Sequence, residues 1–300
     1  MEYTEEQLKK LRAVELDLYK RFSLLCRKHG LCFVTGFGTT LGAIRHKGFI
    51  PWDDDMDFLM PRKDYERFVR LAARELEDPY EILEIRTTEN YVMAFAKLGR
   101  KDSEFLEEAD LHIRYHNGIS IDIFPMDYWP QDKKKRDRLA FRCYVLLRLC
   151  SLSVYPHPKL PADLRGWKRA MARTGCECIH HLLRFFRITP RRLYRRYRKL
   201  ALSTTPEEGG HYVTDLCWCL PRRDGMIGLQ YEEKGLFTPL MTPFEDTEIP
   251  VPEQYDSYLR IAYRDYMTLP PVSKRHSHKP AVLRFPDPLL PGMTQEQKSE

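Results

Sequence analysis

The sequence has 300 residues, of which 43% are hydrophobic and 31% are charged, as is usual for a globular protein in water. No segment approaches the ~18 uninterrupted apolar residues of a membrane span, and the charged N-terminus lacks the apolar core of a signal peptide. Eight cysteines are too few for a disulfide scaffold. We therefore expect a cytoplasmic protein rather than a membrane-spanning or disulfide-rich secreted one.

The first 130 residues alternate helical and strand-like patterns. A helix is predicted over 4–29, where Leu11, Leu18 and Phe22 share one face and Thr4 with Gln7 forms a capping box. A short strand at 32–35 leads through glycines into a helix at 39–45. Further elements are predicted in the order strand 55–60, helix 64–76, strands 80–87 and 91–98, and strand 119–124.

The rest of the chain is divided by its charge. Residues 131–200 hold 20 Lys or Arg and 4 Asp or Glu, whereas the remaining chain is acidic overall. We interpret 131–205 as a basic helical insertion between a core at 1–130 and a C-terminal part at 206–285 that completes the core. That part includes a helix predicted at 253–266, and residues 286–300 are expected to form a loose tail. The fold class is therefore α/β (α+β), a mixed sheet flanked by helices.

An acidic run, Pro51-Trp-Asp-Asp-Asp-Met-Asp-Phe58, is the densest chemical signal. Residues two apart on a strand point the same way, so Asp55 and Asp57 share a face, and Asp53 has the same parity. Carboxylates held side by side repel each other unless a cation lies between them, and hard oxygen ligands favour Mg²⁺ or Mn²⁺. The alternative is a solvated acidic turn. A calcium-binding loop is excluded, because this run lacks the glycine and the closing glutamate that such a loop has at fixed positions.

Glycines precede this run in Gly36-Phe-Gly38-Thr39-Thr40. A strand followed by glycines and a helix start exposes backbone N–H groups that can cradle a phosphate. Glycines can also simply permit a tight turn. A phosphate cradle beside a cation site is what phosphoryl or nucleotidyl transfer requires.

Asp122 alternates with isoleucines on the strand at 119–124 and can complete the acidic site or act as the base for an acceptor hydroxyl. Basic side chains are the candidates for contacting phosphate oxygens. They are Arg45, His46, Lys47, Lys97, Arg275, His276 and His278. The pairs Cys176/Cys178 and Cys217/Cys219 are interpreted as reduced structural thiols rather than a zinc site.

The segment Gly38–Asp57 resembles the hallmark of the LicD family, and the resemblance continues at 60–68, 119–127, 263–271 and 275–278. The resemblance implies a nucleotidyltransferase-like fold in which Asp55 and Asp57 bind Mg²⁺ or Mn²⁺ and Asp122 is the third carboxylate. It implies transfer of a phospho-alcohol, phosphocholine from CDP-choline above all, to a glycan hydroxyl with release of CMP. The acceptors implied are surface or lipid-linked glycans such as lipopolysaccharide, teichoic acid or capsule. The gap from Gly38 to Asp55 is longer than in the wider superfamily and is usual for LicD-like members.

Alternatives remain at this point. The same carboxylates suit a nucleotidyltransferase that releases pyrophosphate while modifying RNA or a small molecule, although no RNA-binding motif is present. A non-catalytic, metal-stabilised adaptor is the second alternative. Choline, ribitol and glycerol are all open as the transferred alcohol. The basic segment 131–200 is either a solvated face or a peripheral contact with the anionic inner face of a membrane.

Overall fold

The structure is a computed structural model that describes residues 3–158, 160, 164–222, 225–275, 277–278 and 280–287. Two compact units are present. The first comprises 1–83, 96–126 and 231–300, and the second comprises 84–95 and 127–230. Among the described residues, no helix is both long enough and apolar enough to cross a bilayer.

The first unit contains a mixed sheet in the strand order β1-β2-β6-β4-β3. β2 is parallel to β6 and antiparallel to β1, whereas β4 is antiparallel to both β6 and β3. The predicted mixed sheet flanked by helices is confirmed. The strands are β1 (Val34–Thr35), β2 (Asp57–Pro61), β3 (Tyr80–Leu83), β4 (Ala96–Arg100) and β6 (Ser120–Tyr128).

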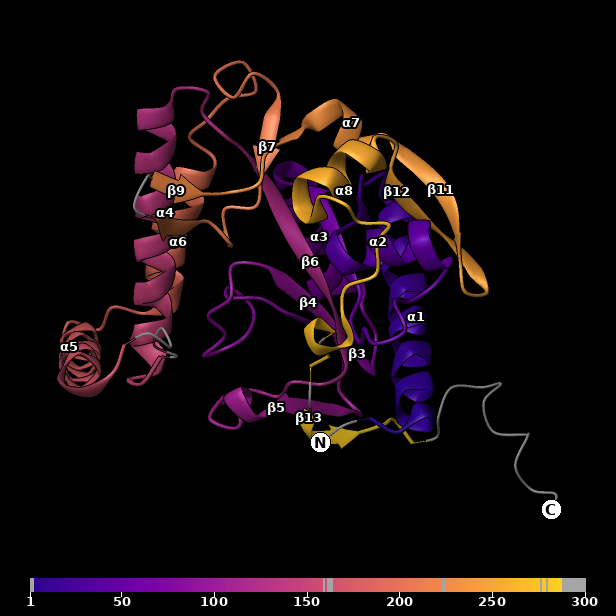
Figure 1. Cartoon of the computed structure of the whole chain (residues 1–300). Helices are drawn as coiled ribbons and strands as arrows, with labels where there is room; N and C mark the ends of the chain where they lie inside the picture. Colours follow the sequence, from indigo (N-terminus) through magenta and orange to yellow (C-terminus); the bar gives the residue numbers. More distant parts are fainter. Residues whose placement is uncertain are drawn as a thin grey trace. The chain divides into compact units, whose positions relative to one another are not determined.

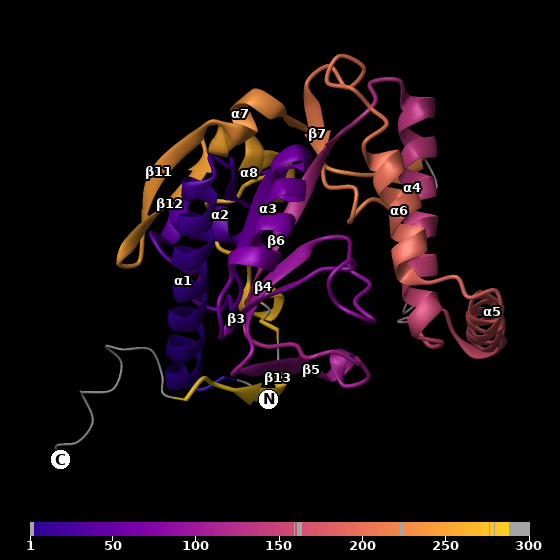
Figure 2. The ribbon, with the colours of Figure 1, turned by 180° about the vertical axis from the view of Figure 1, so that it is seen from behind.

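Helices α1 (Glu5–Lys28) and α3 (Arg62–Glu75) cover one face of this sheet (Figure 2). The capping box predicted for Thr4 and Gln7 is present at the start of α1. Phe22 of α1 packs on Phe58 of β2 and on Phe68 of α3, with ring centroids 5.1 and 5.0 Å away. Burial of these large apolar side chains is the main stabilising contribution to this face.

Shorter elements complete the first unit (Figure 1). Helix α2 (Phe37–His46) contacts α8 (Tyr255–Tyr263), the helix predicted at 253–266. β11 (Pro239–Phe244) and β12 (Thr247–Pro252) form a hairpin, and β5 (Glu104–Glu107) pairs with β13 (Pro280–Arg284). The remaining elements are β10 (Tyr231–Glu232), α7 (Glu233–Phe237) and two 3-10 turns, η1 (Glu108–Asp110) and η2 (Val272–Lys274).

The second unit is mainly helical. Helices α4 (Lys133–Val154) and α6 (Pro190–Ala201) lie side by side, and α5 (Gly166–Phe185) packs against α4 (Figure 1). The last residues of β6 pair with β7 (Tyr212–Thr214), and β8 (Leu220–Arg222) pairs with β9 (Gly225–Ile227). The domain boundaries expected from the sequence stay predictions, and most of the expected tail, 288–300, lies outside the described residues.

The strands expected at 80–87 and 91–98 are shorter than predicted, since β3 ends at Leu83 and β4 begins at Ala96. The backbone carbonyl of Glu84 accepts hydrogen bonds from the N–H groups of Thr87 and Thr88, at 2.9 and 2.8 Å. These bonds turn the chain out of the sheet, and 84–95 joins the second unit. The sequence pattern predicted strands at 80–87 and 91–98 and did not predict the turn between them.

Candidate active site

Three carboxylates of the acidic run face one side of the chain. Asp53, Asp55 and Asp57 are partly exposed, whereas Asp54, Met56 and Phe58 between and after them are buried. Phe58 belongs to the hydrophobic core under α1 and α3. The alternation arises because the backbone is extended, so neighbouring side chains point to opposite faces. The sequence predicted this arrangement from residue parity.

Asp57, Asp122 and Lys97 form a row across three adjacent strands. In the sheet register Asp57 of β2 pairs with Asp122 of β6, and Asp122 pairs with Lys97 of β4. Their neighbours Ile121, Ile123, Ala96 and Leu98 pack into the core, so the row lies on the opposite face. Lys97 Nζ lies 3.0 Å from Asp122 Oδ1. The register between strands, which residue parity within one strand cannot specify, therefore places Asp122 beside Asp57.

The aspartates perturb one another. Burial, followed by the charges of Asp55 and Asp54, raises the pKa of Asp53 to about 7. Burial also raises the pKa of Asp55 to about 6, against the opposing effect of His278. Burial, Asp55 and Asp122 raise the pKa of Asp57 well above its ordinary value. Such a cluster is costly unless a cation binds to it, and perturbed carboxylates of this kind are typical of functional sites.

A cavity of about 650 Å³ opens at these carboxylates. Gly38, Arg45, Asp53, Asp55 and Asp57 are the predicted site residues that line it. Its other walls include Trp52, Tyr263 at the end of α8 and the segment that follows this helix. That segment contributes Asp265, Tyr266, Thr268, Leu269, Pro270 and Pro271.

The glycine motif lies at the start of α2, with Gly36 as its N-cap. A Cβ atom on Gly38 would lie 2.5 Å from Asp53 Oδ2, so glycine is what permits this carboxylate to approach. The N–H of Gly36 donates to Asp57 O at 2.8 Å, and that of Phe37 donates to Tyr258 Oη at 2.8 Å. These two N–H groups of the predicted phosphate cradle are therefore already engaged.

Thr39 and Thr40 are buried, and their hydroxyls have structural partners. Thr39 Oγ1 accepts a hydrogen bond from the N–H of Asp57 at 2.8 Å, and Thr40 Oγ1 lies 2.8 Å from Thr35 Oγ1. The phosphate-binding role of these threonines stays a prediction. Their geometry supports a different contribution, because Thr39 holds the backbone of Asp57 in place.

The predicted basic residues occupy several positions. Arg45 lines the cavity, donates to Tyr266 O at 2.7 Å and contacts His46 Nε2 at 2.9 Å. Burial, followed by Arg45, lowers the pKa of His46. Lys47 is exposed and adopts a left-handed conformation at the end of α2. The guanidinium of Arg275 lies 4.4 Å from the ring centroid of Trp52, which lines the cavity.

His278 binds the acidic run from the far end of the chain, whereas His276 lies outside the described residues. His278 Nδ1 lies 3.1 Å from Asp54 Oδ1 and 3.6 Å from Asp55 Oδ2. The hydrogen bond to Asp54, aided by the charges of Asp55 and Asp54, raises the pKa of His278 to about 9 despite burial. His278 is therefore protonated at neutral pH and offsets part of the negative charge.

Sequence reasoning did not find several residues of the site, including Tyr3, Arg12, Glu15 and Tyr263. The hydroxyl of Tyr3 donates to Asp54, and Arg12 donates to Asp53 O at 2.9 Å. Glu15 is buried beside the run, where burial and then Asp55 raise its pKa well above the ordinary value. Tyr263 lines the cavity, and burial followed by Asp57 raises its pKa. The only signal for any of these residues was that Tyr263 opens one of the blocks that resemble the LicD family.

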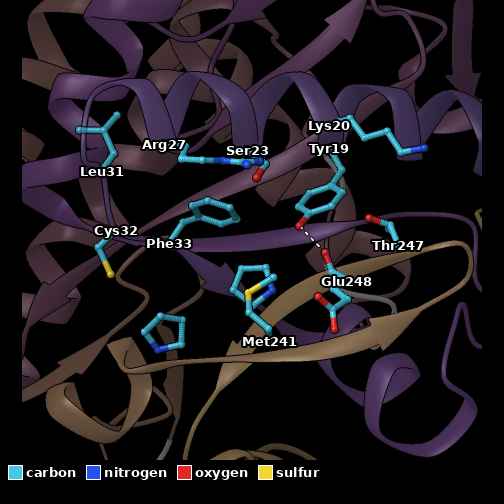
Figure 3. A pocket seen from close by; sticks show the side chains of 12 residues that line it. Tyr19, Lys20, Ser23, Arg27, Leu31, Cys32, Phe33, Met241, Thr247 and Glu248 are labelled. Carbon is cyan, nitrogen blue, oxygen red and sulfur yellow. Dashed lines mark hydrogen bonds between the residues drawn. The ribbon is translucent and has the colours of Figure 1, made fainter.

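A groove of about 510 Å³ lies elsewhere in this unit, between α1 and the β11–β12 hairpin (Figure 3). Tyr19 crosses it and donates to Glu248 O at 2.8 Å. Lys20 and Arg27 lie on the α1 side, and Glu248 is the single acidic residue in its lining. Since this groove has no paired carboxylates, the cavity at Asp53, Asp55 and Asp57 is the better candidate for an active site.

Comparison with known proteins shows what the segment around this site resembles. Residues 30–143 match the family described as LicD/FKTN/FKRP, nucleotidyltransferase domain. This segment contains Asp53, Asp55, Asp57, Lys97 and Asp122. The resemblance to the LicD family is therefore confirmed.

One relative is similar over most of both chains. It is the lipopolysaccharide cholinephosphotransferase LicD of Haemophilus influenzae, which is 26% identical over 287 residues, covering 90% of this chain and 95% of the relative. The similarity therefore extends well beyond 30–143. The comparison supports a transferase.

Proposed function

We propose that this protein transfers a phospho-alcohol group, phosphocholine from CDP-choline in the first instance, to a hydroxyl of a glycan and releases CMP. The observation that carries the proposal is the group of Asp53, Asp55 and Asp57 on one cavity, with Asp122 beside Asp57 in the sheet register. The match to the LicD family and the similarity to a lipopolysaccharide cholinephosphotransferase support it. By that similarity we propose lipopolysaccharide, or a related surface glycan, as the acceptor.

The carboxylates fit Mg²⁺ or Mn²⁺ in chemical kind. Their oxygens are hard donors. Burial, and then the neighbouring carboxylates, raise the pKa values of Asp55 and Asp57, so the negative charge of these groups is unfavourable without a cation, and a bound divalent cation would relieve this cost. No group of three His, Cys, Asp or Glu in the described part of the chain is arranged to hold a metal ion. Magnesium is often bound by one or two carboxylates together with substrate phosphates and water.

We propose that Asp55 and Asp57 are the ligands of the cation. That Asp122 and Asp53 also bind it stays a prediction. When bound, the cation would neutralise charge on the pyrophosphate of the donor. Arg45 lines the same cavity and would bind a phosphate oxygen. Lys97 would add positive charge next to Asp122.

The transfer itself requires an acceptor hydroxyl placed in line with the bridging P–O bond. The acceptor oxygen forms a bond to the phosphorus that carries choline, the P–O bond to CMP breaks, and CMP leaves. We propose that Asp122 receives the proton of the acceptor hydroxyl. The ion pair with Lys97 keeps this carboxylate oriented. Most of the rate acceleration would come from positioning and charge neutralisation.

The proposal is tested by measuring CMP release from CDP-choline, CDP-ribitol and CDP-glycerol with a lipopolysaccharide acceptor, in Mg²⁺ and in EDTA. Metal-dependent release from one donor, lost in Asp57→Asn and kept in the control Asp246→Asn, is expected. Asp246 is an exposed acid, with 71% of its side chain accessible. Pyrophosphate release from a nucleoside triphosphate, without CMP release from any CDP-alcohol, would overturn the proposal in favour of a nucleotidyltransferase.

A further inference from the structure

Helix α5 in the second unit carries large apolar side chains that face solvent. Its buried residues are His180 and Leu183, on the side that packs against α4. His180 Nδ1 lies 2.7 Å from the carbonyl oxygen of Leu152 in α4. By contrast, Trp167 is 68% exposed and Phe185 is 80% exposed. Such exposure is unusual for aromatic side chains, which normally contribute to a core or an interface.

These exposed side chains lie in one stripe along the helix. At about 100° per residue, positions 167, 171, 178, 182 and 185 fall within about 60° of one another. Phe186 follows directly, and its ring centroid lies 5.1 Å from that of Phe185. The stripe consists of Trp167, Met171, Cys178, Leu182 and Phe185, with Ile179 and Phe186 along its edge. A contiguous apolar face on the surface indicates an interaction site.

The charge of the helix identifies the partner. Residues 166–187 contain five Lys or Arg and one Glu. Arg173 and Arg184 are exposed on the polar side of the helix, away from the apolar stripe. Lys168 Nζ lies 5.9 Å from the ring centroid of Trp167, at the border of the stripe. An apolar face rich in Trp, Phe and Leu with a basic polar face is typical of helices that lie on anionic membranes.

We propose that α5 is an interfacial membrane anchor that lies flat on an anionic lipid surface, with Trp167, Leu182 and Phe185 among the acyl chains. The arginines of its polar face and of the surrounding segment contact lipid phosphates. The basic segment 131–200, with 20 Lys or Arg and 4 Asp or Glu, adds long-range attraction to the same surface. The helix does not span the bilayer, since none of the described helices is apolar enough to do so.

The dependence of binding on salt and on lipid composition distinguishes a membrane contact of the apolar face of α5 from the binding of another partner to this face. Attraction of basic residues to anionic lipid is screened within a Debye length, which shrinks from about 10 Å at 0.1 M salt to about 4–5 Å at 0.5 M. Binding should therefore require anionic lipid and weaken at high salt. A second copy of the chain on the same face would instead produce a dimer without vesicles.

The test is co-sedimentation of the full chain with phosphatidylcholine vesicles that contain either no anionic lipid or about one third phosphatidylglycerol. The variant Phe185→Ser/Phe186→Ser is compared with the matched control Leu240→Ser/Met241→Ser, which replaces exposed apolar residues of β11. We expect binding to anionic vesicles only, weakened about tenfold or more in the Phe variant and unchanged in the control. Arg173→Glu/Arg184→Glu should weaken binding and reduce its salt dependence.

Several results would overturn the proposal. Equal binding of the Phe variant and the wild type would remove α5 from the contact. Absence of binding by the wild type, together with a dimer that the Phe variant dissociates in sedimentation velocity, would assign the face to a second copy. Because the replaced side chains are exposed, the variants should fold, and circular dichroism checks this. The assay contains no CDP-alcohol, so its outcome is separate from that of the proposed reaction.

Discussion

Replacing Asp57 by Asn should stabilise the metal-free protein while it abolishes turnover. Asp57 and Asp122 are register partners on adjacent parallel strands. Strands lie about 5 Å apart, and two like charges at this distance repel by about 3 kcal/mol at an effective dielectric constant of about 20. Lys97 neutralises part of the Asp122 charge. We therefore expect the free energy of unfolding to rise by about 1–3 kcal/mol in the variant.

The gain should depend on pH with a definite sign. The pKa of Asp57 in the folded protein is raised well above the ordinary value of 3.8. A carboxyl with a raised folded-state pKa binds protons more tightly when folded, so wild-type stability falls as pH rises from about 4 towards the folded-state pKa. The Asn variant lacks this loss. Its advantage in melting temperature should therefore be larger at pH 8 than at pH 5.

The assay is thermal melting in EDTA across this pH range, with CMP release measured in parallel. A change of 1 kcal/mol corresponds to about 2–4 °C for a chain of this size class. The control Asp246→Asn, at an exposed position, should change stability by less than about 0.5 kcal/mol. A lower melting temperature for Asp57→Asn in EDTA would refute the repulsion argument, and retained CMP release would refute the catalytic assignment.

Three further predictions concern the residues that support the carboxylates. In Gly38→Ala the new Cβ would lie 2.5 Å from Asp53 Oδ2, so thermal melting should show a loss of about 1–3 kcal/mol in stability, and CMP release should fall. In the control Gly175→Ala the new Cβ meets no atom within 4 Å, so this variant should not lose stability. Equal behaviour of the two variants would contradict the steric argument. In Thr39→Val the N–H of Asp57 loses its acceptor at 2.8 Å, which should lower the free energy of unfolding, measured with denaturant, by about 1–3 kcal/mol. Thr39→Ser keeps the hydroxyl and should restore this stability. If Ser does not restore it, the methyl group of Thr39 is what matters. The pKa of His278 is raised to about 9, so the stability that its charge contributes is complete below pH 6.5 and is lost as pH rises through 9. The melting temperature of the metal-free protein should therefore fall more between pH 7 and 9 in the wild type than in His278→Gln. Parallel curves for the two proteins would argue against the contact of His278 with Asp54.

Several features followed from local sequence patterns. The capping box at Thr4 and Gln7 and the apolar face of α1 depend on residues within one or two helical turns. The common face of Asp53, Asp55 and Asp57 depends only on the alternation of an extended chain. The site residues were proposed on this basis and on the LicD resemblance, and their roles in catalysis stay predictions.

Other features required the folded chain. The pairing of Lys97 with Asp122 and the contact of His278 with Asp54 join residues that are 25 and 224 positions apart. The hydroxyl of Thr39, which the sequence suggested as a phosphate contact, accepts a hydrogen bond from the N–H of Asp57, 18 positions along the chain. The strand expected at 91–98 began late because a turn at Glu84 withdrew the preceding residues from the sheet.

The physical reason for the difference is the range of the interactions. Hydrophobic period, capping and parity are set by neighbours within a few residues, so the sequence by itself determined which side chains share a face. Strand register, the closure of the cavity by Tyr263 and the charges around each aspartate depend on which distant segments pack together. Only the tertiary structure decided these, because no local pattern encodes which segments, distant from one another in the sequence, pair in the folded chain.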